Sequence, residues 1–326
     1  MKMRAALCNS FGAAGLAMGE IEQPTPGRGE VLVDVHAAAV SFMDTLMVAG
    51  KYQMRPPLPF VPGSDGAGIV AAVGEGATRF KPGDRVACSH WHGSYGEQMV
   101  ADEHAVTPLP PGLDFATGSA VRHGYGTAHY ALVNCARLQP GETVFVSGAA
   151  GGVGLAAVDL ARHLGAHVIA GVGSPEKAAA VRERGAHDVI DYRAENLKER
   201  IKAVTDGRGV DVFFDNVGGD VFATLSRLMN WGGRVLPIGF TSGEVPSVAA
   251  NLLLLKNYSV VGAFWGAWGS RFPQQSAAAD AAIMELVAAG QLRPLVSARM
   301  PLHDFGKAMD MVNQRQVQGR IVLDIR

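Results

Sequence analysis

A glycine-rich segment constrains this chain more strongly than any other part of its sequence. Residues 144–155 read Val-Phe-Val-Ser-Gly-Ala-Ala-Gly-Gly-Val-Gly-Leu, so an apolar run meets four glycines within seven residues. A helical pattern follows over Val153–His163, and the segment therefore predicts a buried strand, a tight loop and a helix. Against the pattern G-x-G-x-x-G its positions are Ala149, Gly151 and Gly154, so the motif is imperfect and its context carries the prediction. The helix N-terminus would present N–H groups to a phosphate.

The region around this segment alternates between strand and helix patterns. Because parallel strands need long crossover connections, the alternation predicts a doubly wound parallel sheet. A helix is expected to begin at Pro175, with Ser174 as its N-cap. Six strands match a complete dinucleotide-binding sheet, and we expect them at Thr143–Ser147, His167–Ala170, Asp188–Ile190, Val210–Asp215, Arg234–Ile238 and Ser259–Gly262.

The two ends of the chain have a different pattern. Up to about Asp114, short β-rich runs such as Val31–Val40 alternate with proline and glycine turns, which predicts a compact β-domain interrupted by one helix near Phe42–Val48. The tail carries no second glycine loop of this kind, so we expect it to return to the first domain. Its predicted elements are an alanine-rich helix over Gln274–Ala289, a helix near Phe305–Asn313 and a strand at Arg320–Ile325.

Composition excludes several classes of protein. The 29 basic and 30 acidic residues give a net charge of −1 without a basic stripe, which argues against a nucleic-acid partner. No run of about 18 apolar residues occurs, so no membrane span is expected. The cysteines, Cys8, Cys88 and Cys135, are few, far apart and without a C-x-x-C pair, which favours a reducing cytoplasmic setting and excludes a structural zinc of the usual spacing.

The end of the second strand distinguishes between the two nicotinamide cofactors. An acidic residue there would bind the ribose hydroxyl of NAD, but the sequence reads Ala-Gly-Val-Gly-Ser over 170–174. Ser174 and Lys177 could instead bind the 2′-phosphate of NADPH, with Tyr192 closing the pocket, and the rival interpretation is that Lys177 is an exposed helical lysine. The sequence thus predicts NADPH, held by Ala150, Gly151, Gly152, Val153 and Gly154 of the loop together with Ser174, Lys177 and Tyr192.

Five motifs together resemble a known family. They are SFMDTLMVAGKY at Ser41–Tyr52, PGSDGAGIV at Pro62–Val70, FKPGDRV at Phe80–Val86, GAAGGVG at Gly148–Gly154 and QGRIVL at Gln318–Leu323. In order and spacing they resemble the zinc-free, zeta-crystallin-like quinone oxidoreductases of the medium-chain dehydrogenase/reductase superfamily, over essentially the whole chain.

The resemblance implies an α/β protein with a GroES-like, β-rich substrate domain over 1–120 and 266–326 and a Rossmann domain over 121–265. It also implies NADPH-dependent hydride transfer to a quinone or a similar activated enone. Members commonly form homodimers through their sixth Rossmann strand, here Ser259–Gly262. By position, the resemblance adds these cofactor-binding residues: Thr127, Asn216, Ile238, Gly239, Phe240, Phe264, Trp265 and Arg320.

Several positions depart from the family and its relatives. Ser41 replaces a common asparagine and Leu46 a common tyrosine, which leaves substrate choice open. Zinc alcohol dehydrogenases of the superfamily carry a cysteine near position 41 and a histidine–glutamate pair near 64–65, where this chain has Ser41, Ser64 and Asp65. No catalytic metal is therefore expected. Ser41 and Tyr52 are the candidate catalytic residues, although Tyr52 could equally be a core aromatic.

Three functions remain open at this level. The first is a reductase of quinones or other activated α,β-unsaturated carbonyls, in which the protein supplies orientation and exclusion of water. The second is an enoyl or acryloyl thioester reductase, for which Lys51 and Arg55 are the nearest candidates to bind a coenzyme A phosphate. The third is a structural protein that binds NADPH with little turnover.

Overall fold

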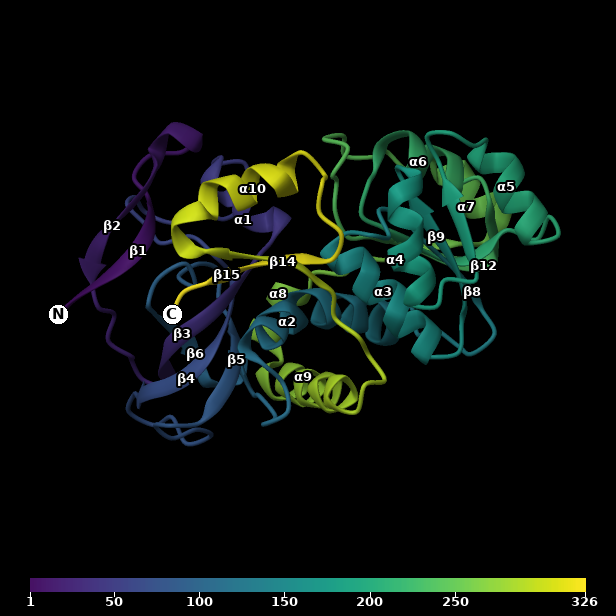
Figure 1. Ribbon diagram of the computed structural model, residues 1–326. Helices are drawn as coiled ribbons and strands as arrows, with labels where there is room; N and C mark the ends of the chain where they lie inside the picture. The colour runs from purple at the N-terminus through teal and green to yellow at the C-terminus, as the bar shows by residue number, and fades with distance from the viewer. The chain divides into compact units, whose positions relative to one another are not determined.

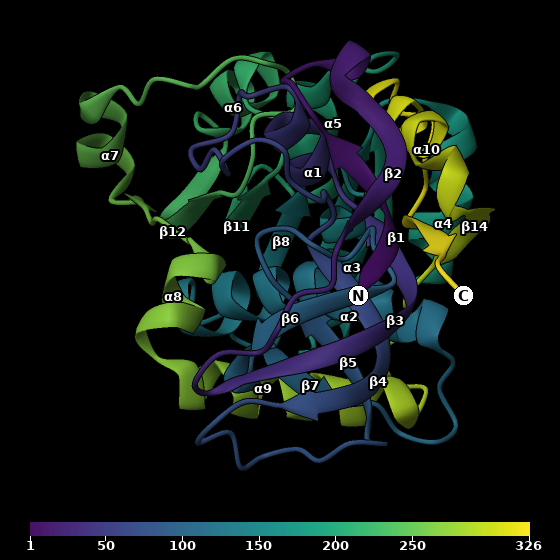
Figure 2. The same cartoon turned by 90° about the vertical axis from the view of Figure 1, so that its left-hand side faces the viewer.

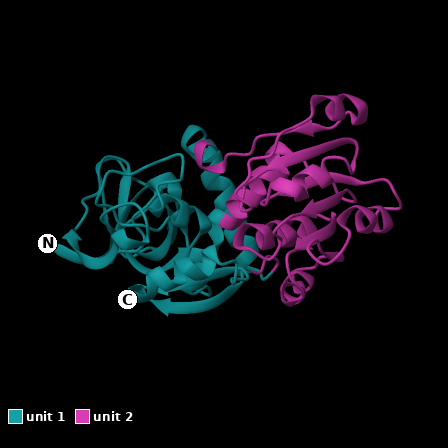
Figure 3. Ribbon diagram, turned by 90° about the horizontal axis from the view of Figure 1, so that it is seen from above, with its two compact units in different colours: residues 1–123, 268–290, 294–326 teal, residues 124–267, 291–293 magenta.

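The computed structural model describes all 326 residues, and the chain divides into two compact units (Figure 3). Unit 1 comprises Met1–His123, Trp268–Gly290 and Pro294–Arg326, and unit 2 comprises Gly124–Ala267 with Gln291–Arg293. The tail thus contributes to both units, since residues 291–293 belong to unit 2 although the sequence placed the whole tail with the first domain. No helix of the chain is long and apolar enough to cross a membrane.

Unit 2 contains a six-stranded parallel sheet in the order β10-β9-β8-β11-β12-β13, with β8, β11 and β12 side by side (Figure 2). The predicted doubly wound architecture is confirmed. Its strands are β8 Thr143–Val146, β9 His167–Val172, β10 Asp188–Asp191, β11 Val210–Asp215, β12 Met229–Pro237 and β13 Ser259–Val260. Its helices are α3 Gly152–His163, α4 Ala178–Glu183, α5 Leu197–Val204, α6 Gly219–Leu225 and α7 Ala250–Lys256.

Apolar residues that lie in register on neighbouring strands form one core cluster of unit 2. Phe145, Ile169 and Phe213 come from three neighbouring strands and are completely buried. Phe145 and Phe213 meet edge to face at 5.7 Å between ring centroids, an arrangement that aromatic pairs favour. This rigid platform holds the loops that follow the carboxyl ends of the strands.

Unit 1 is built around a seven-stranded sheet in the order β14-β15-β3-β4-β5-β7, with β6 paired to β3 (Figure 1). The two chain ends meet here, because β15 pairs antiparallel with β3. The strands are β3 Glu30–Val40, β4 Asp65–Val73, β5 Arg85–Ser89, β6 Gln98–Asp102, β7 Val106–Pro108, β14 Val296–Pro301 and β15 Arg320–Asp324, beside a hairpin of β1 Lys2–Cys8 and β2 Leu16–Glu22. Two short helices, α1 Phe42–Val48 and α10 Phe305–Asn313, pack together, and α9 spans Pro273–Ala288.

Two further helices were not expected from the sequence. Helix α2 spans Phe115–His129 and continues as a π-helical segment, Tyr130–Cys135. Helix α8 spans Trp265–Arg271, so Trp265 and Trp268 are both helical, and Trp268 is buried. The helix expected from Pro175 is interrupted, because Pro175–Lys177 form a 3₁₀ turn before α4 begins.

Candidate cofactor-binding site

The glycine loop follows directly from the centre of the unit 2 sheet. Strand β8 pairs with β9 on one side and β11 on the other, and its last residues are completely buried. The chain then turns through Gly148, whose φ of +58° lies in the left-handed region that favours glycine. Gly151 N–H donates to the Gly148 carbonyl at 3.1 Å, which closes the turn one residue before α3 begins.

Gly151 and Gly154 serve different purposes in this loop. A Cβ at Gly154 would lie 2.3 Å from the Gly148 carbonyl oxygen, so only glycine lets α3 pack against the loop. A Cβ at Gly151 would meet nothing closer than that same oxygen at 3.5 Å. Gly151 is the N-cap of α3 and no side chain caps the helix, so the N–H groups of its first turn have no helical acceptor. This open helix terminus, which includes Gly152 and Val153, suits the pyrophosphate of a dinucleotide.

A buried carboxylate holds the glycine loop to the next strand. Asp215, at the end of β11, accepts hydrogen bonds from Ser147 Oγ at 2.6 Å and from the Val217 and Gly218 N–H groups at 3.0 and 3.1 Å. Asn216 adds a bond from its side-chain amide to the Ser147 carbonyl at 2.8 Å. Burial is the main cause that raises the pKa of Asp215, and these hydrogen bonds oppose it. These hydrogen bonds between Asp215, Asn216 and Ser147, here called the clasp, fix the start of the glycine loop.

The Ser147→Ala variant should destabilise unit 2 and loosen the loop. Ser147 Oγ both donates to Asp215 and accepts from Asn216 N–H at 2.9 Å, so its removal takes one donor from the buried Asp215 carboxylate and leaves the Asn216 N–H without this acceptor. We expect a loss of about 1–3 kcal/mol in the free energy of unfolding, measured by urea denaturation. A matched control is Ser242→Ala, whose hydroxyl is exposed and contacts only Glu244 of its own turn. Equal stability of Ser147→Ala and Ser242→Ala would contradict the role of the clasp.

Strand β9 ends without a carboxylate, as the sequence indicates, and cations lie beside its end. The side chains of Tyr192 and Arg193 both lie over Gly173, where an added Cβ would be 3.6 Å from Tyr192 Oη and 3.5 Å from Arg193 Nε. Ser174 is at the N-cap position but makes no capping bond, which corrects that part of the expectation. A hydrogen bond with the Ser174 side chain instead lowers the pKa of the exposed Glu176. A 2′-phosphate bound here would meet two cations, Lys177 and Arg193, and one carboxylate, that of Glu176.

The residues expected near the nicotinamide follow other strands at the same edge of the sheet. Ile238 and Gly239 N–H groups both donate to the Asp215 carbonyl, at 2.8 and 3.1 Å, so the turn after β12 is tied to the end of β11. Phe240 follows that turn and is partly exposed. These positions lie with Asn216 at the carboxyl ends of β11 and β12, where ligands of such sheets bind.

Three further predicted residues lie elsewhere in unit 2. Thr127 is buried in α2, next to Gly126, where an added Cβ would lie 2.7 Å from the Trp265 ring. Trp265 therefore packs closely against α2, which agrees with a packing role for this side chain. Phe264, its neighbour, is 56% exposed. Their contact with a cofactor stays a prediction.

Ser41, Tyr52 and Arg320 belong to unit 1. Ser41 is almost fully buried and forms a capping box with Asp44 at the start of α1, and its Oγ lies 3.4 Å from Ser64 Oγ. Tyr52 packs against the core of unit 1, with its ring 6.4 Å from Trp91. Burial raises the pKa of the Tyr52 hydroxyl, and Asp44 adds to this. Catalytic roles for Ser41 and Tyr52 stay predictions.

A buried polar cluster surrounds Arg320. Tyr95 Oη donates to Asp44 Oδ2 at 3.0 Å, and His123 Nδ1 lies 4.0 Å from Asp65 Oδ2. Burial is the main cause that raises the pKa values of both carboxyls, and Arg320 opposes the shift at Asp65. Burial, with the charge of Arg320 adding to it, lowers the pKa of His123 to about 4, so the imidazole is neutral at pH 7. The structure thus places Arg320 in this cluster, and its proximity to a cofactor phosphate stays a prediction.

The cluster was largely missed from the sequence. Its only local signal is the S-x-x-D spacing of Ser41 and Asp44, which is typical of a helix N-terminus. No three His, Cys, Asp or Glu side chains of the chain stand in a geometry that could hold a metal ion. His90 and His92, the pair closest in sequence, contact each other, with His90 Nδ1 3.1 Å from the His92 carbonyl.

Comparisons with known proteins agree with these features. Residues 27–111 match the family described as alcohol dehydrogenase GroES-like domain, and residues 152–281 match zinc-binding dehydrogenase. The chain is 39% identical to quinone oxidoreductase-like protein 2 homolog of Nematostella vectensis, over 99% of this chain and 89% of that protein. It is 35% identical to human quinone oxidoreductase, over 93% and 92% of the two chains.

The similarity to a solved structure extends to the three-dimensional fold. A mycobacterial protein described as complexed with NADPH superposes with a TM-score of 0.92 at 30% identity, over 98% of this chain and 99% of that one. The likeness thus covers both the GroES-like region and the parallel sheet with its glycine loop. The chain belongs to the zinc-free quinone oxidoreductase branch of the medium-chain dehydrogenase/reductase superfamily.

Proposed function

We propose that this protein is an NADPH-dependent reductase that transfers a hydride, without a metal, to quinones or similar activated α,β-unsaturated carbonyls. The observation that carries the proposal is the glycine loop, in which the open position of Gly151 and the uncapped N–H groups of the helix terminus form a cradle suited to a pyrophosphate. Relatives named quinone oxidoreductase and a similar structure described as an NADPH complex support it. We assign cofactor binding to unit 2 and substrate binding to unit 1.

The chain's own residues orient the reactants and move protons. NADPH, when bound, supplies the hydride, and the acceptor needs little acid catalysis because conjugation spreads the developing negative charge. The N–H groups of residues 150–154 hold the pyrophosphate, and the clasp on Asp215 keeps them in place. In unit 1, the hydroxyls of Ser41, which accepts from the Asp44 N–H group, and of Tyr52 are the groups that we assign to proton movement.

The Lys177→Ala variant should separate NADPH from NADH. Loss of the Lys177 ammonium removes a charge-assisted contact to the 2′-phosphate, which NADH lacks. We expect KM for NADPH to rise roughly tenfold, while KM for NADH changes less than about twofold. Steady-state kinetics with both cofactors provide the measurement. Equal effects on the two cofactors would remove Lys177 from the site, and Lys81→Ala, an exposed lysine of unit 1, is the control.

A substrate screen tests the proposed activity. NADPH oxidation is followed at constant enzyme with benzoquinone, an alkenal and an acryloyl thioester, after treatment with a chelator. We expect the quinone and the alkenal to be reduced and the chelator to have no effect. Preference for the thioester would favour a thioester reductase, with the exposed Lys51 and Arg55 as candidate phosphate contacts. NADPH binding without turnover on any acceptor would overturn the proposal in favour of a structural role.

We further propose that the protein forms a homodimer through β13. This strand is at the edge of the unit 2 sheet, and an unpaired edge can extend a sheet into a second copy. Apolar side chains are exposed on neighbouring elements, since Leu254 and Leu255 of α7 and Trp231 of β12 are 80%, 67% and 70% exposed. Exposed apolar residues gathered in this way typically mark an interaction surface.

The Leu254→Asp/Leu255→Asp variant should be monomeric. Two carboxylates would be desolvated in the proposed interface, while both positions are exposed in the single chain and tolerate polar residues. Sedimentation velocity measures the expected change from dimer to monomer, and circular dichroism should show unchanged folding. A parent protein that sediments as a monomer, or a variant that remains dimeric, would contradict this interface.

A further inference from the structure

Unit 2 carries a surface hollow whose lining does not include the glycine loop. The hollow has a volume of about 610 Å³ and is lined by residues of α5 and α6, by the segments that follow these helices and by one residue from the end of α7. Gly207–Gly209 precede β11 and Arg227 precedes β12, so these parts of the lining stand at the amino ends of parallel strands. The glycine loop follows the carboxyl end of β8, and none of its residues contributes to the hollow.

The charge of the lining is one-sided. Its fourteen residues include five cations and no acid, although the whole chain has 29 basic and 30 acidic residues. The cations come from three separate segments and are Lys198, Lys202, Arg208, Arg227 and Lys256. Bringing like charges together costs free energy unless a counter-charge accompanies them.

Few of these charges are compensated within the protein. Lys202 lies 3.6 Å from Glu199 in an exposed pair, and Lys256 Nζ donates to the Met229 carbonyl at 3.1 Å. Lys198, Arg208 and Arg227 make no ion pair with any carboxylate. The two guanidinium groups offer forked donors that match phosphate oxygens, and the lysines add point charges. The lining is therefore suited to more than one negative charge.

The floor of the hollow has a different character from its rim. Leu197, Ile201 and Leu228 are buried side chains that line it from below, and the Thr205 hydroxyl is already bonded to the Ile201 carbonyl and the Gly209 N–H group. The volume lies within the range of small-molecule sites, roughly 300–1,000 Å³, and exceeds what inorganic phosphate needs. An occupant thus combines clustered negative charge with an apolar or planar body.

We propose that this hollow binds an organic polyphosphate, with its phosphates on Lys198, Arg208 and Arg227 and its body on the floor formed by Leu197 and Leu228. The site is separate from the glycine loop and does not depend on the proposed reductase activity. The interaction is largely electrostatic, so its affinity falls with rising salt.

Calorimetry on the full-length protein tests the site with inorganic tripolyphosphate and with ATP as probes. The test variant is Lys198→Gln/Arg208→Gln/Arg227→Gln. The matched control is Lys2→Gln/Lys81→Gln/Lys307→Gln, which removes the same charge from exposed positions of unit 1. We expect the test variant to bind both probes at least roughly tenfold more weakly than the parent, and the control to bind within about twofold of it. ATP should bind the parent more tightly than tripolyphosphate because its base covers the apolar floor.

Three outcomes would overturn the proposal. Equal weakening in both triple variants would show that the probes respond only to net charge. Loss of binding in Lys177→Ala with retention in the test variant would place the anion at the candidate 2′-phosphate site instead. A tighter complex with a single-stranded oligonucleotide than with ATP, lost in the test variant, would identify the surface as a nucleic-acid site. Circular dichroism on each variant checks that it is folded. We expect folding to be retained because the substituted cations are exposed.

Discussion

The Gly154→Ala variant is expected to lose both stability and cofactor binding. The added methyl group would lie 2.3 Å from the Gly148 carbonyl oxygen and 2.9 Å from Ala149 Cα. Both are backbone atoms of the loop itself, so no side chain can rotate to make room, and α3 must move away from β8. We expect the free energy of unfolding to fall by about 1–3 kcal/mol, with NADPH affinity falling at least roughly tenfold as the loop deforms. Urea denaturation and fluorescence titration with NADPH measure the two effects.

The Gly151→Ala variant separates loop geometry from ligand contact. Gly151 has a φ of −74°, which alanine adopts freely, and an added Cβ would make only an ordinary contact at 3.5 Å. We expect the stability to change by less than about 0.5 kcal/mol, whereas the affinity for NADPH falls at least roughly tenfold because the methyl occupies space that the pyrophosphate needs. Unchanged NADPH affinity in Gly151→Ala would contradict the cradle. A stable Gly154→Ala variant would contradict the packing argument.

The parallel sheet of unit 2 was predictable because its signals are local. Each buried strand is a short apolar run bounded by turn residues, and the alternation with helices leaves one reasonable topology. Four of the six expected strands overlap the observed ones over most of their length, for example Val210–Asp215 in both, whereas β12 begins at Met229, five residues before the expected start at Arg234. The sixth is shorter than expected, ending at Val260, because β13 is an edge strand paired only with β12.

Helix α2 was not predictable because its glycines have a low intrinsic helix propensity. Gly118, Gly124 and Gly126 lower the intrinsic helix preference of Phe115–His129. In the fold two of them are contact points, since a Cβ would lie 2.8 Å from Leu109 at Gly118 and 2.7 Å from the Trp265 ring at Gly126. Close tertiary packing therefore overrides propensity here, and a single sequence does not reveal which distant side chain demands the small residue.

The candidate site likewise has local features that the sequence reveals and long-range contacts that it does not. Residues 148–154 and the absent carboxylate after β9 are contiguous features and could be identified directly. The Ser147–Asp215 bond joins residues 68 positions apart, and the Tyr95–Asp44 bond joins residues 51 apart. Such pairs depend on the pairing of strands and on the path of loops, so no local spacing indicates them. The sequence therefore predicts the residues of the candidate cofactor site more completely than it predicts the long-range hydrogen bonds that hold them in place.

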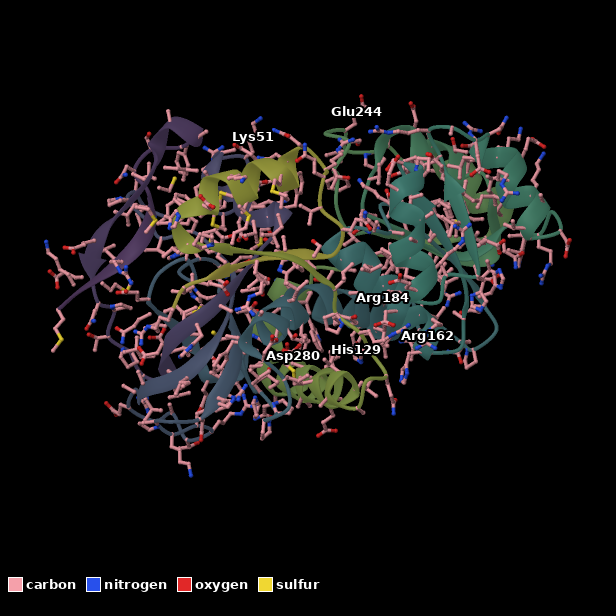
Figure 4. The ribbon with its side chains drawn as sticks, viewed as in Figure 1. Lys51, His129, Arg162, Arg184, Glu244 and Asp280 are labelled. Carbon is pink, nitrogen blue, oxygen red and sulfur yellow. The ribbon has the colours of Figure 1, made fainter.

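The Asp280→Ala variant should be among the most destabilised single variants of the chain. Asp280 projects from α9 (labelled in Figure 4) to the Arg122 guanidinium of α2, and the two side chains are 1% and 4% exposed. Removal of the carboxylate takes the ion-pair partner from a buried cation, which keeps its hydrogen bond to the Ala105 carbonyl. We expect a loss of about 3–5 kcal/mol in the free energy of unfolding, since a buried charge that loses its ion-pair partner carries most of this cost.

An exposed ion pair of the same unit is the control for the effect of burial on the stability cost. Arg299 Nη2 lies 2.6 Å from Asp324 Oδ1, with the two side chains 55% and 36% exposed, so Asp324→Ala should cost less than about 1 kcal/mol. The double variant Arg122→Met/Asp280→Leu removes both buried charges and should recover most of the stability lost in Asp280→Ala, because a matched apolar pair needs no desolvation of charge. Urea denaturation of the four proteins measures these differences. Similar losses in Asp280→Ala and Asp324→Ala, or no recovery in the double variant, would show that packing rather than the buried charge determines the stability of this helix pair.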